Sequence, residues 1–142
     1  MRVLGLDVGE RRIGLAVSDP LGITAQGLGV LNRGKLNEDV EQLQALVRKY
    51  EIEEIVVGLP RALDGGMGPQ AQKVAEFASL LEKKGIKVKF WDERFTTSAA
   101  ERYLIEADVS REKRRRVIDK TAAVLILQSY LDSRRAPGAG RA

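Results

Sequence analysis

Acidic side chains stand at three places in the chain where carboxylates can do chemistry together. Asp7 lies inside an almost wholly apolar run, where a charge is costly unless it is paired or binds a metal ion. Asp92 and Glu93 end a later run of strand-forming residues, and Asp119 precedes a long apolar segment. Carboxylates suit hard ions such as Mg²⁺ or Mn²⁺. Two such ions about 4 Å apart would bridge a phosphodiester, activate water and stabilise the leaving oxygen.

Each of these acids also has a simpler structural explanation. Asp7 would accept a hydrogen bond from the turn at Gly9, and Asp119 would interact favourably with a helix dipole. Asp92 and Glu93 would be an ordinary solvated pair, with Arg94 as a salt-bridge partner. Adjacent strand residues point to opposite faces, so only one of Asp92 and Glu93 is expected to serve a site. Alternation places Asp92 on the more apolar face of its strand, so the residues by themselves leave this choice open.

The composition narrows the chemistry that is available. The chain of 142 residues contains no cysteine and no histidine, which excludes thiolate zinc sites, a cysteine nucleophile and the usual general base. Its net charge of +4 is compatible with a polyanionic partner such as nucleic acid. No apolar stretch is long enough to span a membrane and no signal peptide is visible, so we expect a cytoplasmic protein.

Apolar periodicity predicts the elements that must position the acids. We expect one domain over residues 1–133 and a flexible tail over 134–142. Asn37 is the expected cap of the first helix, Pro69 begins the second and Gly85 ends it. Five strands are predicted, at 2–8, 13–18, 24–31, 54–59 and 87–91. One helix at 36–50 follows the third strand, and another at 69–84 follows the fourth. Two helices follow the fifth strand, the first from the capping box Ser98 and Glu101 onward and the second at 117–134.

This order predicts an α/β fold with a mixed five-stranded sheet and helices on both faces. The opening strands suit an antiparallel meander, and the later strand–helix alternation suits parallel strands. Open α/β sheets place their sites at the carboxyl ends of strands, and both Asp7 and the 92–93 pair are near such ends. Asp119 shares one helix face with Ala122, Ala123 and Ile126, and the two small alanines would allow close approach to the sheet.

Four ordered motifs resemble the YqgF family, also called RuvX, over residues 1–133. They are GLDVGERRIGLAVSD, then VGLP with DGGMGPQAQKV, then WDERFTT, then VIDKTAAVLILQSYLD. The resemblance implies an RNase H-like fold. It also implies that Asp7, Glu93 and Asp119 are the catalytic, metal-binding acids, because they match the family's first-strand aspartate, its DER motif and the aspartate that opens its last helix. Asp92 lies beside the DER acid as a possible further ligand.

The resemblance implies a metal-dependent endonuclease that uses Mg²⁺ or Mn²⁺ on structured RNA or branched DNA. One substrate is the 5′ end of pre-16S rRNA in ribosomal precursor particles, and the other is a Holliday junction. A resolvase must be a dimer to cut two strands symmetrically, whereas an RNA-trimming enzyme can be a monomer. Two other classes compete: a nucleic-acid-binding protein that cleaves nothing, and an actin-like phosphotransferase, whose two fused copies of the fold need more than 142 residues.

Basic and hydroxyl side chains near the predicted acids are candidates for phosphate binding, although each also suits an ordinary solvated surface. The Gly-rich loop at 60–69 lacks the GK[ST] ending of a P-loop, so a flap over the substrate is the expected role. The candidates for nucleic-acid binding are Arg11, Arg12, Arg61, Arg94, Thr96, Thr97, Arg114, Arg115 and Arg116.

Overall fold

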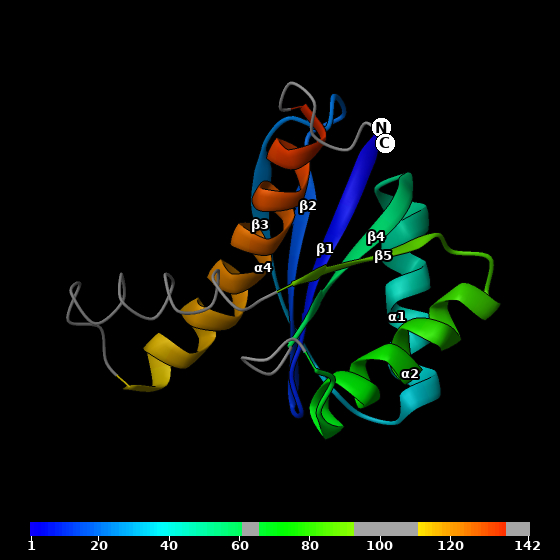
Figure 1. Ribbon diagram of the computed structural model, residues 1–142, viewed down its shortest axis with the longest axis vertical. Helices are drawn as coiled ribbons and strands as arrows, with labels where there is room; N and C mark the ends of the chain where they lie inside the picture. The colour runs from blue at the N-terminus through cyan, green and yellow to red at the C-terminus, as the bar shows by residue number, and fades with distance from the viewer. Residues whose placement is uncertain (61–65, 93–110, 136–142) are drawn as a thin grey trace.

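A five-stranded sheet separates one long helix from a pair of shorter ones (Figure 1). The computed structural model describes residues 1–60, 66–92 and 111–135, and in the last range it describes the side chains of 122–134. The elements are β1 (Arg2–Val8), β2 (Arg12–Ser18), β3 (Ala25–Asn32), α1 (Leu36–Lys49), β4 (Ile52–Leu59), α2 (Pro69–Lys83), β5 (Val88–Asp92) and α4 (Arg111–Arg135).

The sheet has the strand order β3-β2-β1-β4-β5. β2 is antiparallel to both β1 and β3, while β4 is parallel to both β1 and β5. This confirms the predicted meander followed by parallel strands, with helices on both faces. β1 is the central strand, and it is covered on both sides as its apolar sequence predicts.

Alternation along β1 divides the core into two layers. Leu4 and Leu6 pack in the larger layer with α1 and α2, whereas Val3 packs with α4. Gly5 also faces α4, and a Cβ at that position would lie 2.8 Å from Cβ of Leu127. Any side chain at Gly5 would therefore force Leu127, and α4 with it, to shift away from β1. The close approach predicted from the small residues of the last helix is confirmed.

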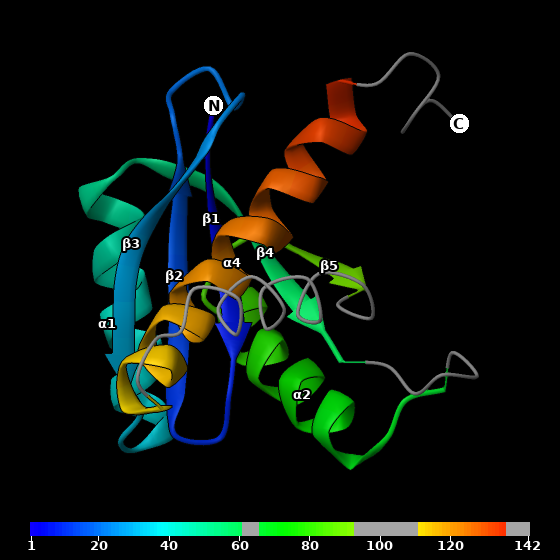
Figure 2. The same cartoon turned by 90° about the vertical axis from the view of Figure 1, so that its left-hand side faces the viewer.

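α4 is longer than its apolar pattern predicts, because it begins at Arg111 instead of Val117 and so includes the basic run. It runs antiparallel to β1 and lies across the sheet (Figures 1 and 2). Its C-terminal end is near the start of β1, where the Arg134 guanidinium lies 4.0 Å from the sulfur of Met1. The helix ends at Arg135, and the rest of the predicted tail lies outside the described residues, as does the predicted helix beginning at Ser98.

The predicted cap of α1 is wrong. The helix begins at Leu36, so Asn37 lies inside it and Lys35 is the N-cap residue, without a side-chain cap bond. The buried carboxylate of Asp39 instead accepts the Gly34 N–H at 2.9 Å and organises the loop before the helix. The predictions for α2 are confirmed, since Pro69 begins that helix and Gly85 follows its C-cap with a φ of 84°. None of the described helices is long and apolar enough to cross a bilayer.

Candidate active site

Asp7 is partly buried on the face of β1 that carries α4. In β2 its pairing partner is Gly14. On the other side, β4 pairs Val57 with Leu6, so the β4 residue that lies beside Asp7 is Gly58. The residues that flank Asp7 on both sides across the sheet are therefore glycines. Cations and phosphate oxygens can approach the Asp7 carboxylate from either neighbouring strand without meeting a side chain of those two residues.

The turn after β1 is closed by the backbone. The Gly9 N–H donates to the carbonyl of Arg12 at 2.8 Å. The hydrogen bond that would explain Asp7 as a turn acceptor is thus made by another group.

α4 brings the backbone of Asp119 toward the same end of β1. The carbonyl of Ala123 lies 3.3 Å from the position that a Cβ on Gly5 would occupy. Asp119 precedes Ala123 by about one helical turn, and Asp7 follows Gly5 by two strand residues. Because the helix and the strand are antiparallel, both steps lead toward the same edge of the sheet (Figure 2). The side chain of Asp119 lies outside the described set.

Asp92 lies on the opposite face of the sheet from Asp7. Its neighbour Trp91 pairs with Gly58 and packs on the α4 side, with its ring 6.0 Å from that of Tyr130. Alternation turns Asp92 to the face of α1 and α2, where Val88 packs. The alternation that placed Asp92 on the more apolar face of β5 is therefore correct, but that face packs against α1 and α2. It is not the face on which Asp7 lies. Glu93 lies outside the described residues.

Of the two predicted phosphate-binding residues whose side chains the structure describes, Arg11 and Arg12, Arg12 lies on the same face of the sheet as Asp7. It begins β2 two residues before Gly14, and it shares the α4-side face with Gly14 and Ala16. Arg11 is exposed in the turn that precedes it. The backbones of Arg114, Arg115 and Arg116 lie in α4, but their side chains are not described. Arg61, Arg94, Thr96 and Thr97 lie outside the described residues.

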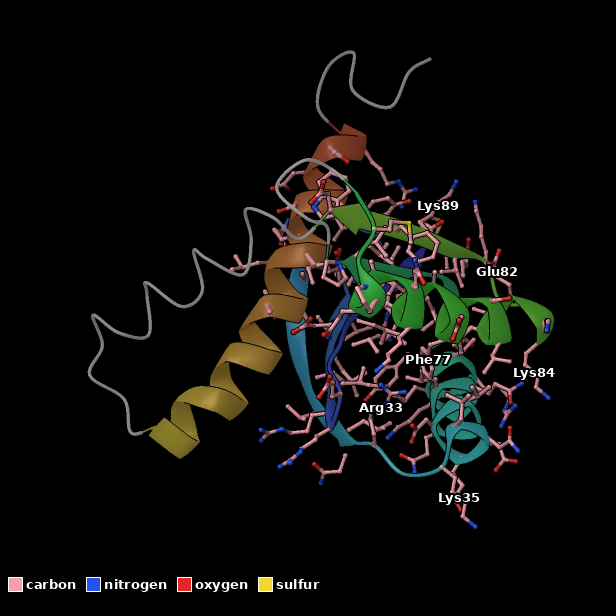
Figure 3. The ribbon with its side chains drawn as sticks, turned by 60° about the horizontal axis from the view of Figure 1, so that its bottom comes forward. Arg33, Lys35, Phe77, Glu82, Lys84 and Lys89 are labelled. Carbon is pink, nitrogen blue, oxygen red and sulfur yellow. The ribbon has the colours of Figure 1, made fainter. Side chains whose placement is uncertain are left out.

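A cleft of about 510 Å³ opens on the other side of β1 and does not include Asp7. One cation that lines it is Arg33, which donates to the carbonyl of Gly9 at 2.8 Å and forms an ion pair with Asp39 at 3.4 Å. The Arg33 guanidinium also lies over the ring of Phe77, 5.3 Å from its centroid (Figure 3). These contacts tie the β1–β2 turn to α1 and α2, so Arg33 has a structural role.

A buried carboxylate fixes α4 on the sheet at the end remote from Asp7. Glu54 of β4 is 2% exposed and accepts the hydroxyl of Tyr130 at 2.6 Å and the guanidinium of Arg134 at 3.2 Å. Lys87 reaches its other oxygen at 3.5 Å. Burial and the bond to Glu54 raise the pKa of Tyr130 to about 12. This cluster holds the helix whose other end carries Asp119.

Three acids or other metal-binding side chains do not gather within the described residues alone. Of the three predicted ligands, only Asp7 is among the residues whose side chains are described. The side chains of Glu93 and Asp119 are not described. The donors of the predicted centre would all be carboxylates, which fits Mg²⁺ or Mn²⁺ better than softer ions. The glycines beside Asp7 were not identified from the sequence, because strand register is needed to place them there.

The antiparallel meander, the parallel strands and the acid on the central strand define an RNase H-like fold. Two of the solved structures that share it are resolvases with bound junctions. T. thermophilus RuvC in complex with a Holliday junction substrate is 18% identical, with a TM-score of 0.57 over 96% of this chain and 97% of its own. Fowlpox virus resolvase with its substrate Holliday junction DNA is 11% identical, with a TM-score of 0.60 over 95% and 99%. At these identities the likeness shows the fold alone.

The chain belongs to the family described as RuvX, Holliday junction resolvase, whose model matches residues 1–133. A relative from Halothermothrix orenii is 56% identical over 133 residues, which cover 93% of this chain and 95% of the relative. One from Heliobacterium modesticaldum is 54% identical over 135 residues, or 94% and 91%. Both are named "Putative pre-16S rRNA nuclease". The family predicted from the motifs is confirmed, and it is a family of nucleases.

Proposed function

We propose that this protein is a divalent-metal-dependent endonuclease that matures the 5′ end of pre-16S rRNA. The observation that carries the proposal is the place of Asp7, on the central strand, between two glycines and on the face that α4 approaches. The names of relatives at 52–56% identity support the choice of RNA. This function places the protein in the cytoplasm, with ribosomal precursor particles as partners.

Asp7, Glu93 and Asp119 are the proposed ligands of Mg²⁺ or Mn²⁺. When bound, the ions supply water activation and charge stabilisation at the leaving oxygen. Asp7 fixes the centre to the most constrained strand of the sheet. Arg12, on the same face, binds a phosphate next to the scissile one and orients the backbone. The chain has no histidine, so no imidazole takes part in proton transfer.

Holliday-junction resolution is the second candidate. The family description supports it, and so do the junction complexes of the two structural neighbours, which share the fold at low identity. This activity requires two copies of the chain, whereas RNA trimming does not. The two candidates therefore also differ in the expected oligomeric state.

The test incubates the pure protein with labelled pre-16S rRNA and with a labelled four-way junction, each with Mg²⁺, Mn²⁺ or chelator. We expect metal-dependent cleavage of the RNA near its mature 5′ end, and no cleavage by Asp7→Asn prepared in parallel. Symmetric cutting of the junction with the RNA left intact would replace the first candidate by the second. Failure to cut either substrate, with the protein folded and metal present, would overturn both.

A further inference from the structure

We propose that Lys87 and Lys89 form a phosphate-binding track along β5 that guides the nucleic-acid backbone to the Asp7 centre. The proposal rests on the proposed function, since it assigns a path for that substrate. Both lysines belong to the alternating sequence KVKFW, in which every second residue shares a face. The track consists of the side chains of Lys87 and Lys89.

The track lies on the α4 side of the sheet, which is also the side of Asp7. Lys89 pairs with Val56, a member of the α4-side core, and Lys87 reaches Glu54 on that face. Figure 3 shows Lys89 on the side of β5 away from α2. Trp91 continues the same row and contacts Tyr130 of α4. This face therefore carries Lys87 just before β5, then Lys89 within the strand, followed by the aromatic ring of Trp91.

The track points at the centre. β5 is parallel to β4 and β4 to β1, so all three strands advance toward the same sheet edge. Trp91 pairs with Gly58 of β4, and Gly58 lies beside Asp7 of β1. Strands are about 4.8 Å apart, so Trp91 is roughly 10 Å from Asp7 across the sheet, and along the strand direction Lys89 and then Lys87 follow at steps of about 6.6 Å. Successive phosphates of one backbone can follow such a row.

The charges of this surface fit a polyanion. The side chain of Lys87 is 64% exposed and that of Arg134 is 40% exposed, and the two share the single carboxylate of Glu54. Lys89 is exposed, and among the described residues no carboxylate lies within ion-pair distance of it. Three cations against one buried acid leave a positive surplus beside the row. Lysines bind phosphate as point charges, so this contact would position the strand without reading its sequence.

The test measures binding of a labelled RNA hairpin in chelator, where the proposed nuclease does not cut, over a series of salt concentrations. The variants are Lys89→Gln, the double variant Lys87→Gln/Lys89→Gln, and the control Lys49→Gln. Lys49 is exposed on α1, in the other helix layer, and its replacement removes the same charge. We expect the slope of log affinity against log salt to flatten by about 0.7 to 0.9 for each lysine removed from the track.

Trp91 supplies a local readout, because it is the only tryptophan of the chain. Its fluorescence should change when the parent or Lys49→Gln binds the hairpin, and the change should need more RNA in the double variant. Lys89→Gln leaves the Lys87–Glu54 pair intact, so an effect of this variant is not caused by a loosened α4. Circular dichroism and melting confirm that each variant is folded.

The outcomes separate the track from the proposed function. Metal-dependent cleavage by the parent, with slopes of the track variants equal to that of Lys49→Gln, overturns the track alone. Flattened slopes in a protein that never cleaves support the track and overturn the nuclease. A parent that binds no RNA hairpin at any salt concentration overturns the track, and the proposed function is then decided separately by metal-dependent cleavage of pre-16S rRNA.

Discussion

Asp7 of β1 and Trp91 of β5 lie on the same face of the sheet, in one row joined by Gly58 of β4. Asp92, the next residue after Trp91, faces the opposite helix layer. An acid that acts with Asp7 must reach the α4 side. This relationship separates two neighbouring carboxylates that the sequence alone does not separate.

The first prediction concerns these two acids. Glu93→Gln should reduce metal-dependent cleavage by at least about two orders of magnitude, as expected when a metal ligand is removed, and Asp92→Asn by less than about tenfold. Single-turnover rates at saturating metal measure both. A larger loss in Asp92→Asn would mean that the ligand comes from the α1 and α2 face.

Much of the fold is readable from local signals. Pro69 and Gly85 mark the two ends of α2 because their backbone preferences need no tertiary contact. Asn37 misled the prediction because a good capping residue can also lie inside a helix, and here the buried Asp39 organises the loop instead. The start of α4 was predicted too late because a basic run has no apolar period to reveal it.

The site is less readable because it depends on register. Asp7 stands out locally as a charge in an apolar strand. The glycines beside it and the face of Asp92 follow only from pairing across strands, which one sequence does not give. The row of Lys87, Lys89 and Trp91 has a visible period of two. The sequence does not show that this row lies on the same face of the sheet as α4 and Asp7, and the proposed role of the lysines depends on that.

The second prediction separates catalysis from binding at Asp7. Asp7→Asn keeps the size of the side chain and removes a charged ligand. Cleavage should fall by at least about two orders of magnitude, while the affinity for RNA in chelator stays equal or rises, because one negative charge near the phosphates is gone. Unchanged turnover, with contaminating nuclease excluded, would remove Asp7 from the mechanism.

The third prediction concerns the basic run at the start of α4. If Arg114, Arg115 and Arg116 bind phosphates, their replacement by Gln should flatten the salt slope by about 0.9 for each arginine that binds one. The matched control is the triple variant Lys49→Gln/Lys83→Gln/Lys84→Gln, which removes the same charge from the α1 and α2 layer. Equal slopes in the two triple variants would assign the arginines to ordinary solvated surface.

The fourth prediction concerns Tyr130 and pH. Burial, followed by the bond to Glu54, raises its pKa from 10.0 to about 12. A folded pKa above the unfolded one gives stability that is complete below pH 10 and is lost as the pH rises through 12. Tyr130→Phe should therefore lose less stability than the parent over this range in chemical denaturation. Glu54→Gln should bring the pKa of Tyr130 down toward 10.0, as followed by tyrosinate absorbance, whereas an unmoved titration would contradict the bond.

The last prediction concerns stability without metal. In the proposed centre the carboxylates of Asp7, Glu93 and Asp119 converge, and each close like-charged pair costs on the order of 1 kcal/mol when no cation lies between them. Asp7→Asn relieves part of this repulsion. The Gly9 N–H donates to the carbonyl of Arg12, so it is not the donor that Asp7→Asn would leave without a partner. In chelator the variant should melt at the same temperature as the parent or higher.

Added Mg²⁺ or Mn²⁺ supplies the second half of that experiment. Binding to the folded state raises the melting temperature, so added metal should raise that of the parent more than that of Asp7→Asn. As the metal concentration increases, the parent's melting temperature should therefore reach or exceed that of the variant. Lys49→Gln, remote from the centre, should respond to metal as the parent does. If Asp7 is instead a structural acceptor, the variant will melt clearly lower in chelator and metal will shift both proteins alike. That pattern would exclude the metal centre at Asp7 while leaving the family and the fold unchanged.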